Sequence, residues 1–341
     1  MKRVKMVVVG AGVIGFSTAV CIAESLPFCE VTLVADQFSP DTTSDGAAGI
    51  MFVAQFPDIP LERQKLWFKD SFDHLLAIAQ SDQAADAGVL LTSGCQIFRE
   101  VPAQKVPFWS ELVLGFRFLT ERELKRFPEH CFGQAFTTIK CECSSYLPWL
   151  EKRFRKAGGK VQQRTVNHLQ ELGGTYELIV NCSGLGARTL VGDEQVHPVR
   201  GQVLKVQAPW IHHFIRDGDG QTYIYPGVHS VMVGGTRQEG DRRRWADPAD
   251  SADILRRCGL LEPSLAKGKV LAEWVGLRPG RRNPRVEREV LVTEGNGRRV
   301  HVVHNYGHGG GGVTLSWGTA LDALGLVKQC LREMVHPQAR L

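Results

Sequence analysis

Apolar and polar residues alternate with different periods along the chain, and the first change of period lies near the amino terminus. An apolar run at 5–9 is followed by a glycine-rich turn and then by apolar residues at helical spacing. A second apolar run at 29–35 ends in an acid, Asp36. Short apolar runs bounded by turns are typical of buried strands, and the spacing between them is typical of a helix. The pattern therefore predicts a strand, turn, helix and strand within about 30 residues.

The turn after the first strand has the sequence GAGVIG, which matches the dinucleotide-binding pattern G-x-G-x-x-G. Gly10 permits a tight turn, Gly12 lets the backbone approach a pyrophosphate, and Gly15 lets helix and strand pack closely. The pyrophosphate would lie at the start of the helix, where free amides and the helix dipole favour negative charge. Asp36 is placed to accept hydrogen bonds from adenosine ribose hydroxyls. This unit predicts a bound dinucleotide.

The rest of the chain mixes both periods. Apolar stripes predict helices, and short apolar runs predict strands; the helices are expected at 61–80, 148–156 and 314–333, and the strands at 178–182 and 300–303. Between 199 and 236, short apolar runs are separated by glycine and proline, which is typical of an antiparallel sheet. We therefore expect an α/β (α+β) fold, in which a Rossmann-like domain lies beside a second domain built on an antiparallel or mixed β-sheet.

A second glycine loop, GHGGGG at 307–312, also follows a strand and opens a helix. Too few residues remain after it for another βαβ crossover. A helix start can instead stabilise the negative charge that a flavin ring gathers on reduction. One chain could thus grip a dinucleotide at both ends. The alternative is a packing loop with excess glycine.

Length and composition narrow the class of protein. At 341 residues the chain exceeds the usual size of one hydrophobic core, so we expect two domains. The apolar runs are shorter than the roughly 20 residues of a membrane span, and the basic amino terminus lacks the apolar stretch of an export signal. The nine cysteines have no metal-ligand spacing and predict reduced thiols without a metal site.

The net charge of +5 is spread over several loops, with its densest run at 242–244. No nucleic-acid-binding motif accompanies these residues, so we expect no nucleic-acid partner. Solvated loops with a mild attraction for acidic small molecules are the simpler interpretation.

A series of motifs, in order over essentially the whole chain, resembles the FAD-dependent D-amino-acid oxidases. They are VVVGAGVIGFSTA, DTTSDGAAG, NCSGLGAR, PVRGQVL, YIYPG, GGTRQ, VGLRP and HNYGHGGGG. The resemblance implies a noncovalently bound FAD. It places among the FAD contacts Gly10, Gly12, Val13, Ile14, Gly15, Asp36, Gln37, Thr43, Ser44, Gly49, Met51, Val166, Ser183, Gly184, Gly307, Gly309, Gly311, Gly312, Val313 and Thr314. We assign 1–50, 141–190 and 280–341 to the FAD-binding domain, and 51–140 and 191–279 to the substrate-binding domain.

The same resemblance implies the substrate site. Arg278 matches the family's binder of the α-carboxylate, and Tyr223 matches the phenol that also donates to it; both are expected to be catalytic. Arg216 and Arg237 resemble residues of family members that act on acidic D-amino acids, whose second carboxylate needs a second cation. Which of the two meets that carboxylate stays open. Arg237→Ala is expected to cost far more activity on D-aspartate than on D-alanine, whereas Arg216 can equally be a solvated loop residue.

The implied reaction is oxidative deamination of D-aspartate, D-glutamate or N-methyl-D-aspartate by hydride transfer to flavin N5. Molecular oxygen is the acceptor, and the products are a 2-oxo acid, ammonia and hydrogen peroxide. The alternative is an oxidase of neutral D-amino acids; a nicotinamide-dependent dehydrogenase and a non-enzymatic binding module are more distant. Glycines before Tyr223 suggest a hinge loop that closes over the substrate.

Several positions depart from the family pattern. Gln55 lies where relatives tend to carry a proline and a histidine, and it is taken as a substrate contact. Arg282 replaces a proline and Gly310 a serine.

The last three residues, Ala339, Arg340 and Leu341, resemble the Ser-Lys-Leu peroxisomal address. Because peroxide production suits that compartment, we expect an import receptor as partner and location in the peroxisomal matrix. The sequence leaves a homo-oligomer open.

Overall fold

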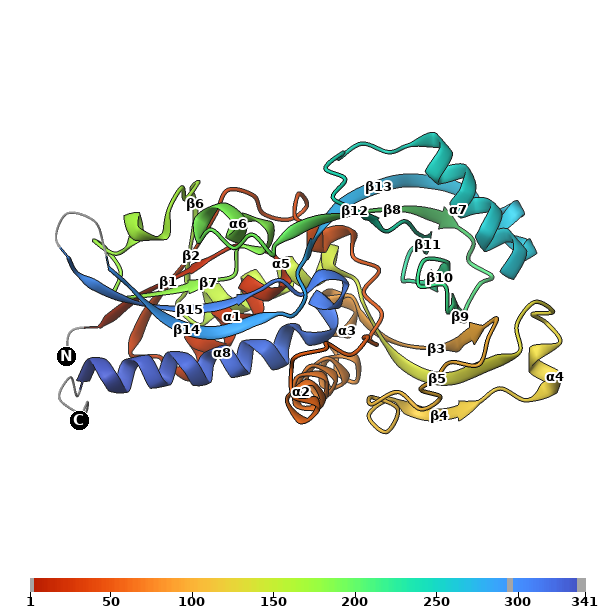
Figure 1. Ribbon diagram of the computed structural model, residues 1–341, viewed down its shortest axis with the longest axis horizontal. Helices are drawn as coiled ribbons and strands as arrows, with labels where there is room; N and C mark the ends of the chain where they lie inside the picture. Colours follow the sequence, from red (N-terminus) through yellow and green to blue (C-terminus); the bar gives the residue numbers. More distant parts are fainter. Residues whose placement is uncertain (1–2, 293–296, 336–341) are drawn as a thin grey trace.

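In the computed structural model, residues 3–292 and 297–335 are described, and their strands form two sheets (Figure 1). The first sheet has the order β14-β15-β7-β1-β2-β6. Its strands are β1 (Val4–Val9), β2 (Cys29–Ala35), β6 (Lys160–Gln163), β7 (Leu178–Asn181), β14 (Arg285–Val292) and β15 (Arg299–Tyr306). All of its pairs are parallel except the β14–β15 hairpin. This confirms the predicted Rossmann-like unit.

The second sheet has the order β12-β8-β11-β10-β9-β3-β5-β4, and β13 pairs with the free side of β8. Its strands are β3 (Val89–Phe98), β4 (Leu114–Phe118), β5 (Phe132–Cys141), β8 (His197–Gln207), β9 (Phe214–Asp217), β10 (Tyr223–Pro226), β11 (Val231–Gly234), β12 (Gln238–Glu239) and β13 (Lys269–Gly280). The β3–β9 pair is parallel and the other pairs are antiparallel. The sheet is therefore mixed, as expected.

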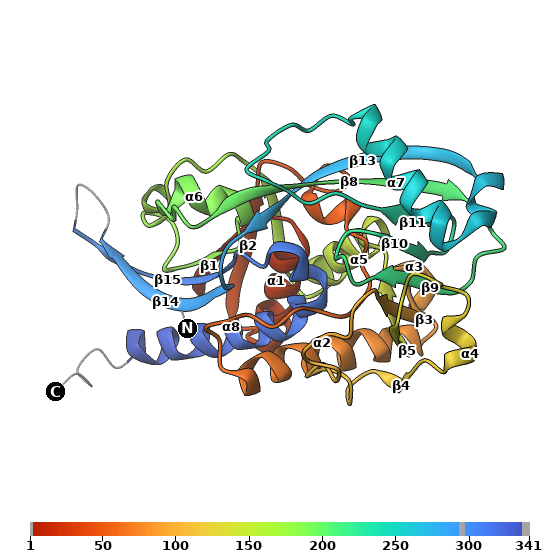
Figure 2. The same cartoon turned by 45° about the vertical axis from the view of Figure 1, so that its right-hand side comes forward.

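The two sheets follow the predicted division of the chain. Strands of the first lie within 1–50, 141–190 and 280–341, and those of the second within 51–140 and 191–279, apart from the last residues of β5 and β13. The boundaries of two folding units stay a prediction. Figures 1 and 2 show the strands β8 and β13 running from the second sheet toward the first.

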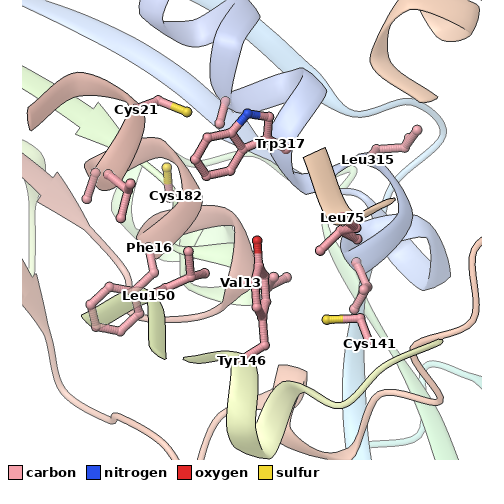
Figure 3. Packing of buried hydrophobic residues seen from close by; sticks show 14 of the residues in the cluster. Val13, Phe16, Cys21, Leu75, Cys141, Tyr146, Leu150, Cys182, Leu315 and Trp317 are labelled. Carbon is pink, nitrogen blue, oxygen red and sulfur yellow. The ribbon is translucent and has the colours of Figure 1, made fainter. Parts of the chain in front are cut away.

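Helices α1 (Val13–Ser25), α5 (Cys143–Lys156) and α8 (Gly312–Val335) pack with the first sheet, and α2 (Leu61–Ala79) lies against α8. Figure 3 shows side chains from these four helices meeting in one buried cluster, with Tyr146 of α5 and Trp317 of α8 among them. The parallel strands need crossover connections, and such connections are usually helices. Helix α8, near the carboxyl terminus, also packs against α1, near the amino terminus.

Helix boundaries agree with the sequence prediction except at α5. We expected this helix at 148–156, but it begins at Cys143, so that Pro148 lies inside it. Proline favours the first turn of a helix, which is why the sequence suggests a later start. The earlier turn forms because Tyr146 and Leu147 are fully buried in the core.

The described part of the chain contains neither a candidate membrane-spanning helix nor a candidate metal site. No helix there is long and apolar enough to cross a membrane. Nor do its His, Cys, Asp and Glu side chains form a group of three that could hold a metal ion.

Two glycines of α8 predict opposite effects on stability. A Cβ atom at Gly318 would lie 2.1 Å from the carbonyl oxygen of Trp67, whereas one at Gly325 would meet nothing within 4 Å. We expect Gly318→Ala to lower the free energy of unfolding by about 1–3 kcal/mol through overpacking. Gly325→Ala should raise it by about 0.5–1 kcal/mol, because alanine has the higher helix propensity. Denaturant unfolding of both variants tests this; a loss for both would contradict it.

Candidate active site

One cleft, of about 1720 Å³, is lined by residues from both sheets. This volume exceeds the roughly 300–1,000 Å³ of ordinary small-molecule sites. There is consequently room for a dinucleotide and a second, smaller ligand together.

The start of α1 faces this cleft. Gly10 has a φ of +113°, and a Cβ atom there would lie 2.4 Å from the carbonyl oxygen of Cys182. A Cβ atom at Gly15 would lie 1.9 Å from the carbonyl oxygen of Gly10. Gly12 caps the helix without a side-chain hydrogen bond, and no acid occupies the first turn. The amide of Val13 donates to Oγ of Ser44 at 3.1 Å, and the amides that follow it in the first turn have no acceptor within the helix, so this end of α1, which lines the cleft, suits a pyrophosphate.

A second helix start opens onto the same cleft. Residues 307–314, which contain a short 3₁₀ turn at Gly309–Gly311 and the beginning of α8, all line it. Asp36, at the end of β2, lines it near α1. Two positive helix ends and an acid placed for a ribose fit the FAD that the sequence predicts.

The charge of the cleft is strongly positive. Its acids are Asp36 and Glu239, and its arginines are Arg164, Arg216, Arg237, Arg244, Arg278, Arg281 and Arg282. Four of these guanidinium groups form ion pairs: Arg164 with Glu171, Arg237 with Glu239, Arg281 with Asp193, and Arg282 with Asp58. Within residues 3–292 and 297–335, the cleft arginines without an ion pair are Arg216, Arg244 and Arg278. Such uncompensated charge suits an anionic ligand.

Arg278 is held by β13 above a glycine of β8. A Cβ atom at Gly201 would lie 2.3 Å from Nη1 of Arg278, so the guanidinium rests directly on the backbone of β8. Nη1 also donates a hydrogen bond of 3.1 Å to the carbonyl oxygen of Thr236. A guanidinium carries five N–H groups, which leaves donors for a carboxylate.

Tyr223 lies beside Arg278 and is positioned by two glycines. A Cβ atom at Gly234 would lie 2.4 Å from Cζ of Tyr223, and one at Gly235 would lie 2.9 Å from its hydroxyl. The Tyr223 ring stacks on Tyr225 at 4.4 Å between centroids. Burial raises the pKa of Tyr223, and the nearby charge of Arg278 partly opposes this shift. The phenol therefore stays protonated at neutral pH and can donate a hydrogen bond.

Arg216 lies in strand β9, opposite Tyr223 in β10, and not in a solvated loop. Its guanidinium lies over Phe52, with Cζ 4.4 Å from the ring centroid. Nε is buried and has no hydrogen-bond partner in the described part of the chain. A buried donor left unpaired costs about 1–3 kcal/mol, so this nitrogen favours a ligand that accepts.

The segment between Arg216 and Tyr223, which the sequence predicts to be a hinge, is a turn fixed by hydrogen bonds. Oδ1 of Asp219 accepts hydrogen bonds from the backbone amides of Gln221 and Thr222, at 2.7 and 2.8 Å. The amide of Asp217 donates to the carbonyl oxygen of Thr222 at 2.8 Å. Arg216 and Tyr223 thus lie in paired strands and are placed before any ligand arrives.

The structure brings most of the predicted site residues together. Gln55, Arg216, Tyr223, Arg237 and Arg278 line one cleft, and so do all predicted FAD contacts except Gly15 and Met51. Gly15 has the packing role expected of the third glycine. Met51 is fully buried; its backbone amide donates to the carbonyl oxygen of Ile139, and its carbonyl oxygen accepts from the hydroxyl of Thr138, so its prediction as an FAD contact stays a prediction.

The two other departures from the family pattern also have clear surroundings. Arg282 forms an ion pair with Asp58 at 2.5 Å near the cleft. At Gly310 a Cβ atom would meet only Cδ of Arg278, at 3.9 Å, which leaves space for a small side chain.

The cleft residues that the sequence does not predict include Phe52, Arg244 and Trp274. The Trp274 indole lies between two glycines: a Cβ atom at Gly46 would come within 2.0 Å of it, and one at Gly276 within 1.9 Å. The sequence signal for this arrangement is Gly276, two positions after Trp274 and therefore on the same face of the strand. Phe52 lies in an apolar stretch without any such signal, and Arg244 was read only as part of a basic run.

Comparison with known proteins identifies the family. The family model of the FAD dependent oxidoreductases (DAO) matches residues 5–323. Human D-aspartate oxidase is 54% identical over 99% of this chain and 98% of its own, and Caenorhabditis elegans D-aspartate oxidase 1 is 37% identical over 96% and 98%. The crystal structure of glycine oxidase from Geobacillus kaustophilus shares the fold, with a TM-score of 0.76, 22% identity, and coverage of 96% and 95%. The chain belongs to the family of FAD dependent oxidoreductases.

Proposed function

We propose that the chain oxidises acidic D-amino acids, namely D-aspartate and also D-glutamate or N-methyl-D-aspartate. The products are the 2-oxo acid, ammonia and hydrogen peroxide, with molecular oxygen as acceptor. The observation that carries this proposal is the set of arginines around Tyr223, in which Arg216 and Arg278 have no ion pair and Nε of Arg216 has no partner in the described residues. Similarity to two D-aspartate oxidases supports it.

FAD, when bound, supplies the two-electron oxidation of the carbon–nitrogen bond. The side chains of this chain orient the substrate. Arg278 binds the α-carboxylate as a planar fork, and the protonated phenol of Tyr223 donates to the same group. Arg216 is placed to bind the side-chain carboxylate, with Arg237 nearer the exposed rim. Two fixed anionic groups leave one orientation of the α-hydrogen, so that one enantiomer is accepted.

Arg216 and Arg237 predict a selective loss of activity on acidic substrates. Arg216→Ala should lower kcat/KM for D-aspartate roughly 10- to 100-fold, because it removes charged hydrogen bonds in a buried setting. Arg237→Ala should cost less, about fivefold, because its side chain is 67% exposed and paired with Glu239. D-Alanine, which lacks the second carboxylate, should be affected little by either change.

The measurement is peroxide release by the FAD-loaded enzyme over a panel of D-amino acids, with L-aspartate as control. Equal losses on D-aspartate and D-alanine would show that neither arginine reads the side chain. If the unmodified enzyme releases no peroxide from any acidic D-amino acid, the proposed function itself is wrong.

The glycine beneath Arg278 predicts a loss that does not depend on the substrate side chain. Gly201→Ala would push the guanidinium from its place, because the new Cβ atom would lie 2.3 Å from Nη1. We expect kcat/KM for D-aspartate and D-alanine to fall together, by about 10-fold or more, since both lose α-carboxylate binding. Gly259→Ala is the control, as a Cβ atom there meets nothing within 4 Å. Unchanged kinetics in Gly201→Ala would refute this role of Arg278.

We also propose that Ala339, Arg340 and Leu341 direct the chain to the peroxisomal matrix through an import receptor. These residues lie outside the described part of the chain. The support is chemical: the proposed reaction releases hydrogen peroxide, and the tripeptide resembles a peroxisomal address.

A pair of fusions tests this location. A fluorescent protein at the amino terminus leaves the tripeptide free and should give punctate fluorescence that coincides with a peroxisomal marker. The same protein at the carboxyl terminus masks the tripeptide and should give diffuse fluorescence. Punctate fluorescence from both fusions would exclude the tripeptide as the address.

A further inference from the structure

The loop between β12 and α7 (Pro248–Leu261) is fixed from beneath by a buried arginine. The side chain of Arg200 is fully buried and forms an ion pair of 2.7 Å with Asp250. Its Nε donates to the carbonyl oxygen of Arg243 at 3.2 Å, and its Nη2 donates to that of Trp245 at 2.8 Å. The backbone on both sides of Arg244 is therefore held in place.

The three arginines of this loop have different surroundings. The guanidinium of Arg243 binds Asp241 at 2.8 Å and Asp247 at 3.0 Å. Arg242 and Arg244 are both exposed, and neither has a hydrogen bond or ion pair in residues 3–292 and 297–335. Of these two, Arg244 lines the cleft and Arg242 does not. The loop thus presents one uncompensated cation to the cleft.

Two charged side chains near this loop in the sequence, Arg237 and Glu239, are already paired. Arg237 lies 3.3 Å from Oε1 of Glu239, and Nε2 of His197 lies 2.9 Å from Oε2 of the same carboxylate. Glu239 is thereby shared between two partners. An anion that enters here meets Arg244 as the cation that no neighbouring carboxylate occupies.

We propose that Arg244 is a substrate-selecting residue, which draws acidic D-amino acids into the cleft by their side-chain carboxylate. This rests on the proposed function, because the benefit requires a substrate with a second negative charge. Arg244 is exposed, so it acts through the field at the cleft mouth and raises the local concentration of anions. Since Arg278 and Tyr223 orient the substrate, Arg244 affects capture and leaves the chemical step unchanged.

The test compares Arg244→Ala with Arg242→Ala, a matched loss of one exposed, unpaired arginine from the same loop. In the FAD-loaded enzyme at low ionic strength, Arg244→Ala should lower kcat/KM for D-aspartate about three- to fivefold. Its kcat on D-aspartate and its kcat/KM on D-alanine should stay at the unmodified values. At an ionic strength of about 0.3 M the difference should largely vanish through screening. Arg242→Ala should match the unmodified enzyme throughout, and Arg244→Lys should restore most of the loss.

Three outcomes would overturn the inference. An equal loss of kcat/KM in Arg242→Ala would mean that only net charge matters. A loss in Arg244→Ala that salt does not reduce would point to a structural effect. An equal loss of kcat/KM on D-alanine would remove the selectivity. The proposed function is judged separately. If the unmodified enzyme prefers D-aspartate while Arg244→Ala is unchanged, the inference alone fails; if the unmodified enzyme does not oxidise D-aspartate, the proposed function fails first.

Discussion

The pairing of β8 with β13 is the constraint on which the substrate side of the cleft depends. It runs antiparallel from Lys269 opposite Gln207 to Gly280 opposite His197, and the chain then continues into β14 of the first sheet. Trp274, Gly276 and Arg278 lie at every second position of β13 and pair with Val203, Gly201 and Val199 of β8; all six line the cleft, together with Leu277 and Pro279. A slip of one residue would turn them to the other face. The register of this pair therefore sets which side of the sheet the Arg278 side chain occupies.

Some arginines of the cleft are paired with carboxylates of the chain, and others are left without a counter-ion. Carboxylates of the chain neutralise the arginines that hold loops, such as Arg281 with Asp193 and Arg282 with Asp58. Arg278 and Arg216 keep no such partner among the described residues. Both side chains are partly buried, and a partly buried cation without a counter-ion is costly, so an anionic ligand offsets part of that cost on binding. In the absence of a ligand, some hydrogen-bond donors of these side chains have no acceptor, and Nε of Arg216 is the clearest example.

The sequence predicts the first sheet better than the second for a physical reason. The nucleotide unit is local, so Gly10, Gly12 and Asp36 are close in sequence and their spacing reports their geometry. The substrate side is assembled from distant segments: Gly201 lies beneath Arg278, and Gly234 against Tyr223. No periodicity links such pairs. Family resemblance predicts roles for Arg278 and Tyr223, whereas no pattern in the sequence indicates their glycine supports or Phe52. Met51 is predicted as an FAD contact, and in the structure it is fully buried.

The arginines of the cleft differ in burial. Arg244 and Arg237 are exposed, whereas Arg216 has a buried Nε and Arg278 rests on the backbone of β8. The same pair of charges attracts more strongly as water is removed, because the effective dielectric constant falls. Contacts at the mouth are therefore weak and quickly exchanged, and those inside are strong and directional. An anion bound inside the cleft therefore gains more from each charge contact than one at the surface, and it loses more hydration in return.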